Sequence, residues 1–250
     1  MTSYENEAVA DGAVVTWVGS VHVTAGPVGV RAAEIPQWSA ARAETPPDLG
    51  AITIFEGGRD DDALRHLRQA LTELDEYFRR ERREFTVRLD PQGTEFYRAA
   101  WAEVARVPYG ETRSYGEIAQ AIGAPAAVRA VGAANGANPV APFVPCHRIV
   151  GSDGRLTGYG PGLPLKARLL AMEGAIPDAA DGYDAWVAAL RARNGGGNAL
   201  VLGLRGVSRF CAPGCDRSRV RWALPPRVFA NADHAREAGY LPCPQCGGRE

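Results

Sequence analysis

Residues 108–150 read PYGETRSYGEIAQAIGAPAAVRAVGAANGANPVAPFVPCHRIV, and this stretch decides the fold of the central part of the chain. Ser114 and Glu117 stand at the S-x-x-E spacing of a capping box, in which each side chain satisfies a backbone N–H at the start of a helix. The spacing therefore predicts that a short helix begins at Tyr115.

A tight turn follows that first helix. Gly123, Ala124 and Pro125 interrupt it, and Pro125 suits the first position of a new helix because its missing N–H is not needed there. We expect this second, alanine-rich helix over 126–135, closed by Gly136. Two helices joined by a tight turn form a helix-turn-helix pair. The small side chains of the second helix suit either close approach to DNA or tight packing in a core.

The region upstream predicts a mixed lobe. Residues 13–35 alternate as strands with Gly and Pro breaks, and apolar residues over 64–78 then repeat at helical spacing. A further helix is expected over 94–106. We therefore predict an α/β (α+β) fold class, with an N-terminal scaffold lobe over 1–88 followed by a helical domain over 89–176.

The region downstream predicts a linker and a second, smaller domain. A short helix is expected over 183–190, and the run NGGGN at 194–198 is typical of a domain linker. We place the linker over 177–198 and a small module over 199–250.

Composition limits the class of protein. With 250 residues, 46% of them hydrophobic and 23% charged, the chain is expected to be soluble and globular. It has neither a run of about 18 apolar residues nor a secretory signal at its start, so we expect a cytoplasmic protein without a membrane segment. The net charge of −1 divides into −6 over 1–87, +2 over 88–174, −1 over 175–199 and +4 over 200–250. The basic excess therefore lies in the middle and at the end of the chain, where a phosphate-binding surface would need it.

Cys146 stands between Pro145 and a His-Arg pair. Nearby positive charge favours the thiolate, and a free thiol with a pKa of about 8.5 needs that help at neutral pH. His147 is a potential base and Arg148 a permanent cation. Adjacent side chains in an extended segment point apart, so Cys146 and His147 need a turn or a bridging water to communicate. A buried cysteine beside a surface histidine is the alternative interpretation of this pair alone.

The surrounding motifs favour the chemical interpretation. GETRSYGEIA, RAVG, NP before VPCHRIV, GY and LLAMEG occur in order between 85 and 174, and this stretch resembles the O6-alkylguanine-DNA alkyltransferases, also called methylated-DNA–protein-cysteine methyltransferases. The resemblance implies stoichiometric transfer of a methyl or alkyl group from O6-alkylguanine in DNA to Cys146, leaving a stable thioether. It further implies that His147 acts as base through a water and that Glu173 orients it. Asn138 would brace the turn that carries the acceptor.

The resemblance also implies roles in DNA binding. A base inside a duplex cannot present its O6 substituent to a buried thiol, so the nucleotide must be flipped out. Tyr115 would lie near the target phosphate and help to rotate the nucleotide, and Arg129 would fill the gap left in the stack. The second helix would enter the minor groove, where Ala127 and Ala130 permit close approach. The alkyl-base pocket would be lined by Val144, Tyr159 and Gly160.

The other cysteines predict a metal site. They are Cys211, Cys215, Cys243 and Cys246. Two short-range pairs separated by 27 residues have the composition of a closed tetrahedral Zn²⁺ site. A region of about fifty residues has too small a hydrophobic core to fold without a cross-link such as a metal site. We therefore expect Zn²⁺ in a site of four cysteine ligands and no organic cofactor.

The segments around this site, RFCAPGCDRSR and RVFANADHAREAGYLPCPQCGG, resemble the zinc module of the bacterial adaptive-response protein Ada. That resemblance implies that Cys211 is a second acceptor, which takes methyl from a methylphosphotriester. Arg217, Arg219 and Arg221 would contact phosphate. The order of the domains is reversed relative to Ada, and no length remains for its transcription-activating domain, so no transcriptional switch is expected. A structural zinc with incidental DNA affinity is the equal alternative.

Two other functions compete with alkyl transfer. One is a non-enzymatic protein that binds alkyl lesions and carries a structural zinc module, and the other is a cysteine hydrolase. Stoichiometry separates them, because a binder transfers no group, a transferase transfers one and a hydrolase turns over many times. For the transferase we expect double-stranded DNA as partner, a monomer, and a nucleoid-associated location in the cytoplasm.

Overall fold

The computed structural model describes residues 9–37, 49–55, 61–176, 182–193, 200–204, 207–213, 215 and 226–248. The chain divides into two compact units. The first comprises Met1–Ala105, Ala130–Cys146 and Tyr159–Leu165, and the second comprises Arg106–Arg129, His147–Gly158 and Lys166–Glu250. The expected mixture of helices and sheets is confirmed. The expected domain boundaries stay predictions, and much of the expected linker lies outside the described residues.

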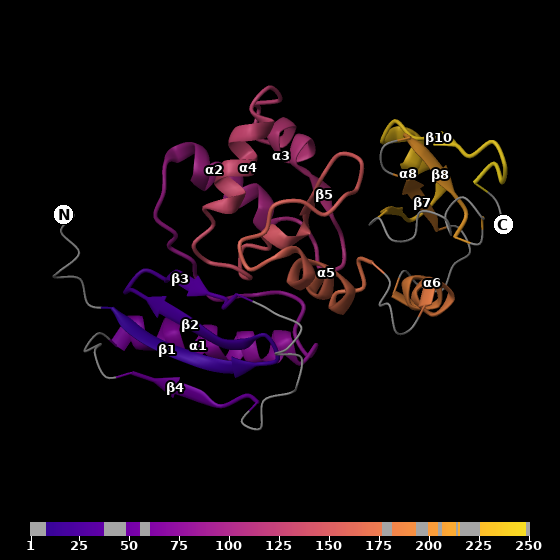
Figure 1. Ribbon diagram of the computed structural model, residues 1–250. Helices are drawn as coiled ribbons and strands as arrows, with labels where there is room; N and C mark the ends of the chain where they lie inside the picture. Colours follow the sequence, from indigo (N-terminus) through magenta and orange to yellow (C-terminus); the bar gives the residue numbers. More distant parts are fainter. Residues whose placement is uncertain are drawn as a thin grey trace. The chain divides into compact units, whose positions relative to one another are not determined.

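The first unit begins with an antiparallel sheet in the order β3-β2-β1-β4 (Figure 1). Its strands are β1 (Ala10–Thr16), β2 (Gly19–Ala25), β3 (Val30–Glu34) and β4 (Ile52–Ile54). The β1–β2 register pairs Ala10 with Ala25 and Thr16 with Gly19, so the connection is a tight hairpin. The strands expected over 13–35 are therefore present.

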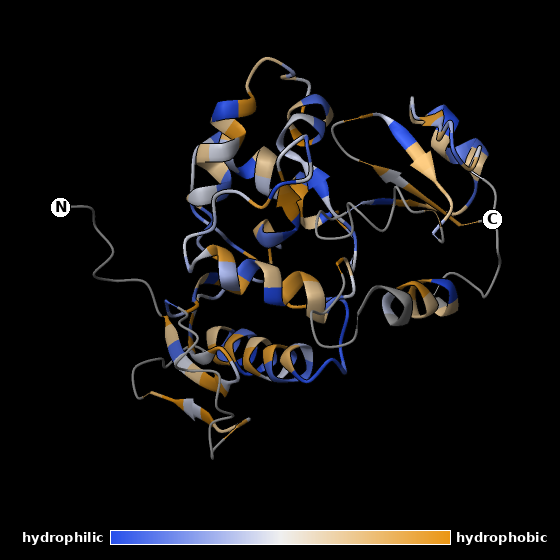
Figure 2. Ribbon diagram, turned by 45° about the vertical axis from the view of Figure 1, so that its right-hand side comes forward, coloured by the Kyte–Doolittle hydropathy of each residue, from blue (hydrophilic) through white to orange (hydrophobic). Residues whose placement is uncertain are grey.

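Helix α1 (Asp61–Phe78) covers this sheet. Leu67, Leu71 and Leu74 are fully buried, as the helical spacing predicts. Figure 2 shows hydrophobic and hydrophilic colours alternating along the helices, which is typical of amphipathic packing. The helix approaches β1 closely, because a Cβ at Gly12 would lie 2.9 Å from the Leu71 Cδ1 atom.

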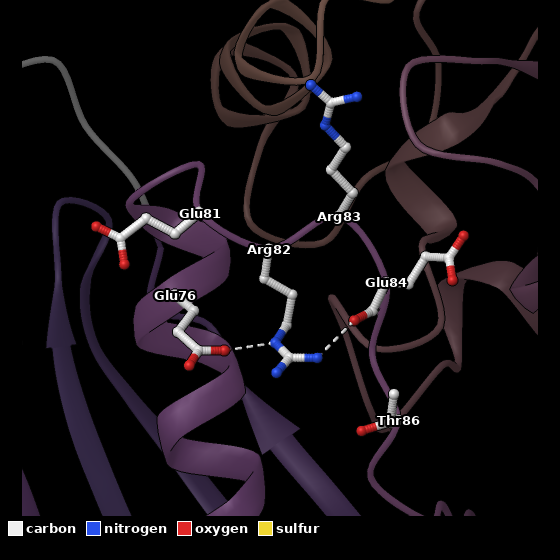
Figure 3. A pocket seen from close by; sticks show the side chains of 6 residues that line it. All are labelled: Glu76, Glu81, Arg82, Arg83, Glu84 and Thr86. Atoms are coloured by element: carbon white, nitrogen blue, oxygen red, sulfur yellow. Dashed lines mark hydrogen bonds and ion pairs between the residues drawn. The ribbon is translucent and has the colours of Figure 1, made fainter.

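A buried carboxylate fixes the segment after α1. Glu73 accepts hydrogen bonds from the Thr86 backbone N–H at 2.9 Å and from the Val87 N–H at 3.2 Å. Beside it lies an open polar pocket of about 600 Å³ (Figure 3). Arg82 spans this pocket, donating to the Glu76 carboxylate at 2.6 Å and to the Glu84 carbonyl at 3.0 Å. Because Arg82 is held by the Glu76 carboxylate and the Glu84 backbone, we assign this pocket to the scaffold.

Helix α2 (Glu95–Ala105) is the helix expected over 94–106. Thr94 opens it, since its Oγ1 accepts a hydrogen bond from the Tyr97 N–H at 3.2 Å. Trp101 is buried on its inner face. The indole N–H of Trp101 donates to the Ala134 carbonyl at 2.7 Å and so ties α2 to a later helix.

Helix α3 (Tyr115–Ala121) begins where the capping box predicts. Both halves of the box are present, with the Glu117 N–H donating to Ser114 Oγ at 3.2 Å and the Ser114 N–H to Glu117 Oε2 at 2.7 Å. Just before it, β5 (Arg113–Ser114) pairs in parallel with β6 (Ile149–Val150). The pairing ties the start of α3 to the strand that follows Arg148.

Helix α4 (Val128–Gly136) begins two residues later than predicted. Pro125 lies in the preceding turn, where the Ala127 N–H donates to the Ala124 carbonyl at 2.8 Å. Pro125 therefore helps to close the turn and does not open the helix, and Gly136 is the last helical residue.

Helix α5 (Leu163–Met172) ends in a glycine cap. Gly174 has φ 73°, its N–H donates to the Ala171 carbonyl at 2.9 Å, and the Ala175 N–H donates to the Leu170 carbonyl at 2.8 Å. This is the pattern of a Schellman motif. It explains the EG at the end of LLAMEG, because Gly174 closes the helix and Glu173 is held immediately before it.

The C-terminal region of the second unit contains a four-stranded sheet in the order β10-β8-β7-β9. Its strands are β7 (Val201–Leu204), β8 (Arg209–Cys211), β9 (Arg227–Phe229) and β10 (Leu241–Pro242), with α8 (Ala232–Glu237) between the last two. The helix expected over 183–190 is present as α6 (Gly182–Arg193). Trp186 and Leu190 of α6 pack with Leu200 and Leu202, so α6 contributes to the core of this region. Within the described residues, no helix is long and apolar enough to cross a membrane.

Candidate active site and metal centre

Cys146 begins a short 3₁₀ helix, η2 (Cys146–Arg148), so the turn that the sequence required at this point is present. The cysteine is only 5% exposed. Its N–H donates to the Val144 carbonyl at 2.8 Å, across Pro145. The Cys146 thiol is therefore buried and carried on a tightly wound backbone.

Asn138 braces the approach to this turn. Its Nδ2 donates to the Val144 carbonyl at 2.8 Å, and its Oδ1 accepts a hydrogen bond from the Val140 N–H at 3.1 Å. Both ends of the amide are thus used within the loop before Cys146. The position agrees with the bracing role that the sequence predicts.

His147 and Glu173 meet in a buried pair, 26 residues apart in the chain. The distance from His147 Nε2 to Glu173 Oε1 is 2.9 Å, and both side chains are fully buried. Because Glu173 engages Nε2, the tautomer with hydrogen on Nε2 leaves Nδ1 as the basic nitrogen. This is the arrangement of a base oriented by a carboxylate.

Arg148 completes the cluster, and its pairing was not predicted. Its Nε donates to Glu173 Oε2 at 2.9 Å and its Nη2 to Glu173 Oε1 at 2.8 Å, so the contact is bidentate. Its Nη1 donates to the Val107 carbonyl at 2.6 Å. The sequence showed a cation next to Cys146, but the partner lies 25 residues away, beyond the reach of local patterns.

Burial and charge set the protonation of this cluster. Burial lowers the pKa of His147 despite the neighbouring carboxylate, so the ring is neutral at pH 7. Burial alone would raise the pKa of Glu173, but the hydrogen bonds from His147 and Arg148 and the charge of Arg148 outweigh it and hold that pKa well below its ordinary value. Since the ring is neutral, the cation that keeps Glu173 ionised is Arg148.

The predicted DNA-contacting residues lie on α3 and α4. Helix α4 buries Val131, Ala134 and Asn135 and exposes the face with Arg129 and Ala130. Ala127, immediately before α4, is half-buried. Apart from Val128 and Arg129, the exposed residues of α4 are small, which permits close approach of a ligand backbone.

Tyr115 opens α3, and its hydroxyl donates to the Thr157 carbonyl at 3.2 Å. A Cβ at Gly158 would lie 3.3 Å from that hydroxyl, and Gly158 has φ 48°. The tyrosine therefore lies against the 157–158 loop. Lys166, which is fully buried, donates to the same Thr157 carbonyl at 2.6 Å.

The three predicted pocket residues differ in burial. Val144 is buried, Tyr159 is half-buried and Gly160 is exposed. The Gly160 carbonyl accepts a hydrogen bond from Gln37 Nε2 at 2.9 Å, so the scaffold lobe supports this loop. Sequence patterns gave no sign of that long-range support.

The four other cysteines come together in the second unit. Cys211, Cys215, Cys243 and Cys246 have Sγ atoms that all lie within 4.8 Å of one another. Strands β8 and β10 are parallel, with Phe210 beside Pro242, so the chain delivers Cys211 and Cys243 side by side at the same edge. After each strand the chain supplies a second cysteine, Cys215 after β8 and Cys246 after β10.

This arrangement fits a metal ion. Tetrahedral Zn–S bonds of about 2.3 Å place sulfur atoms about 3.8 Å apart, which is compatible with four Sγ atoms that lie within 4.8 Å of one another. Burial and the neighbouring thiols raise the pKa of Cys211, and a divalent cation is the partner that would stabilise four thiolates at such distances. Arg217, Arg219 and Arg221, which were predicted to contact phosphate, lie outside the described residues.

Known proteins match the central part of the chain. Residues 95–175 match the family described as the DNA-binding domain of 6-O-methylguanine DNA methyltransferase. The crystal structure of the Mycobacterium tuberculosis OGT in complex with DNA superimposes with a TM-score of 0.51 and 40% identity, covering 64% of this chain and 90% of that one. The chain belongs to the methylated-DNA–protein-cysteine methyltransferase family.

Two curated relatives of this family align with the same part of the chain. The methyltransferase of Methanosarcina acetivorans is 53% identical over 107 residues, which are 43% of this chain and 69% of the relative. That of Mycolicibacterium paratuberculosis is 58% identical over 104 residues, which are 42% of this chain and 63% of the relative. The sequence match thus spans somewhat less than two thirds of the latter protein's length.

Proposed function

We propose that this protein repairs alkylated DNA by transferring a methyl or other alkyl group from the O6 of guanine to Cys146. The Sγ–carbon bond forms as the O6–carbon bond breaks, and the base leaves as guanine after gaining a proton. The thioether that results is stable, so each molecule acts once. The observation that carries the proposal is the buried cluster around Glu173. In it the carboxylate orients the neutral imidazole of His147, the residue directly after Cys146.

The proton path follows from the same contacts. His147 is neutral and receives the thiol proton through a water, while Glu173 stabilises the imidazolium that forms. Arg148 keeps Glu173 ionised throughout. Asn138 holds the backbone before the acceptor, which limits the directions that the thiol can take.

The DNA partner is double-stranded DNA with the alkylated base flipped out. Helix α4 enters the minor groove, where Ala130 and the preceding Ala127 permit close approach, and Arg129 fills the stack. Tyr115 rotates the target nucleotide, and Val144, Tyr159 and Gly160 line the pocket. We further propose that the protein acts as a monomer, in the cytoplasm and at the nucleoid.

Stoichiometry tests this function. Increasing amounts of duplex DNA containing O6-methylguanine are incubated with a fixed amount of protein, and repaired guanine is counted. A plateau at one guanine per protein supports transfer. A plateau at zero with retained DNA binding would favour the non-enzymatic alternative, and repair without a plateau would favour a hydrolase.

For the C-terminal cluster we propose a structural Zn²⁺ held by its four cysteines. The four Sγ atoms within 4.8 Å of one another support a metal ion, with Cys211 as one of its ligands. Methylphosphotriester DNA distinguishes this role from that of a second acceptor. A zinc-loaded protein that stays unmodified supports the structural role, and a methyl group mapped to Cys211 would establish the second repair activity.

A further inference from the structure

Two asparagine amides bracket the acceptor. Asn138 Nδ2 donates to the Val144 carbonyl at 2.8 Å, and Asn135 Nδ2 donates to the Cys146 carbonyl at 3.2 Å. Between these carbonyls lies Pro145, which has no N–H of its own to fix the turn. Asn138 was expected from the sequence, whereas Asn135 makes the contact to the acceptor residue itself.

The direction of the Asn135 side chain is fixed by its helix. The preceding residue, Ala134, accepts the indole hydrogen bond of Trp101 at 2.7 Å. Trp101 is 2% exposed and Asn135 is 5% exposed, so both lie in packed surroundings. One chain of contacts therefore runs from α2 through the end of α4 to the Cys146 carbonyl.

The oxygen of the Asn135 amide lies in surroundings that do not favour stability. Only the NH₂ group can face a carbonyl acceptor, which fixes the orientation of the amide. Its Oδ1 is then buried, with no hydrogen-bond partner among the described residues. A buried acceptor without a partner destabilises a fold, which offsets the stability that the hydrogen bond to Cys146 contributes.

We propose that Asn135 is a second positioning residue of the transfer reaction, which orients the Cys146 thiol by holding the Cys146 carbonyl. The inference rests on the proposed function of Cys146. Without the Nδ2 donor, the Cys146 carbonyl loses one of its restraints, and the thiol shifts from the line of attack. A displacement of about 1 Å can lower a rate by about 100-fold, so we expect the single-turnover rate to fall at least about 10-fold.

The test compares Asn135→Leu with the wild type in single-turnover transfer to Cys146, DNA affinity and thermal unfolding. We expect Asn135→Leu to keep its DNA affinity, to unfold near the wild-type temperature because the unsatisfied Oδ1 and the hydrogen bond to Cys146 are lost together, and to transfer at least about 10-fold more slowly. Asn231→Leu is the matched control, since Asn231 only caps α8, with its Oδ1 accepting from the His234 N–H at 2.9 Å. It should unfold earlier and transfer at the wild-type rate.

Asn135→Asp supplies an independent readout. A carboxylate cannot donate to the Cys146 carbonyl, but the protonated acid can, so the rate of this variant relative to wild type should rise as pH falls. This pH profile also decides the matter if Asn135→Leu does not fold. A wild-type rate in Asn135→Leu, or an Asn135→Asp profile parallel to wild type, would overturn the inference. Absence of transfer in the wild type itself would instead refute the proposed function.

Discussion

The chain places its cysteines in two contrasting surroundings. Cys146 is alone, on a wound turn, and the next two residues contact the buried carboxylate of Glu173. The other four have their sulfur atoms within 4.8 Å of one another, at the ends of parallel strands. The difference shows that neighbours decide the chemistry of a thiol. A single thiol beside an oriented imidazole suits attack on carbon, whereas clustered thiols suit a metal ion.

Metal removal should give the largest effect and separate the two regions. Structural Zn²⁺ sites bind with about 10–16 kcal/mol, much of it coupled to folding, so a strong chelator should unfold the region from β7 to β10. Transfer to Cys146 should persist. Limited proteolysis and zinc content, measured with the repair assay, check this. Unfolding of the whole chain by the chelator would contradict the separation.

Glu173→Gln should give the next largest effect, now in the Cys146 region alone. The change leaves Arg148 buried without its charged partner, and breaking such a buried pair lowers the free energy of unfolding by about 3–5 kcal/mol. Urea denaturation measures the loss.

The matched control for that variant is Glu111→Gln. Glu111 makes a surface pair with Arg113 at 3.7 Å, with side chains 43% and 31% exposed. Surface pairs contribute about 0–1 kcal/mol, so this variant should stay close to wild type. Equal losses in the two variants would contradict the importance of burial.

Much of this contrast was predictable from the sequence, because the residues concerned are close together in the chain. Ser114 and Glu117 are three residues apart, so their capping box could be read directly. The cysteine spacings likewise predicted the cluster that the structure shows. Cys146 and His147 stand in one short motif, and family resemblance supplied Glu173.

What sequence could not provide depends on distant contacts. The bidentate Arg148–Glu173 pair and the Asn135 contact to Cys146 arise only when separate segments meet. The start of α4 was misplaced because Pro125 suits a turn as well as a first helical position. The packing of α6 with β7 was missed because its glycine-rich surroundings indicated a linker.

Acid should weaken the Cys146 region. The pKa of His147 is lowered in the folded protein, so below its unfolded value of about 6.5 the unfolded chain binds more protons and stability falls. Glu173, whose pKa is also lowered, adds a further loss below about pH 4.3. Each group contributes at most about 1.4 kcal/mol per pH unit.

Urea denaturation between pH 8 and pH 5 checks the histidine part of this dependence. His147→Gln should flatten the curve near pH 6, because glutamine takes up no proton there. A wild-type stability that rises on acidification would contradict a buried neutral imidazole.

Ser114→Ala should give the smallest effect. Loss of an N-cap lowers the free energy of unfolding by about 1 kcal/mol, because the Glu117 N–H loses Ser114 Oγ as its acceptor. DNA affinity should fall with it, since α3 carries Tyr115. A larger loss than that of Glu173→Gln would reverse this order of importance.

Peptide mass spectrometry after incubation with duplex DNA containing O6-methylguanine tests the central claim most directly. Transfer replaces one hydrogen by a methyl group, so the account predicts a gain of about 14 daltons on the peptide that contains Cys146. Cys146→Ala should show no gain anywhere in the chain. An unmodified Cys146 in the wild type, or the same gain on a cysteine of the C-terminal cluster, would contradict it.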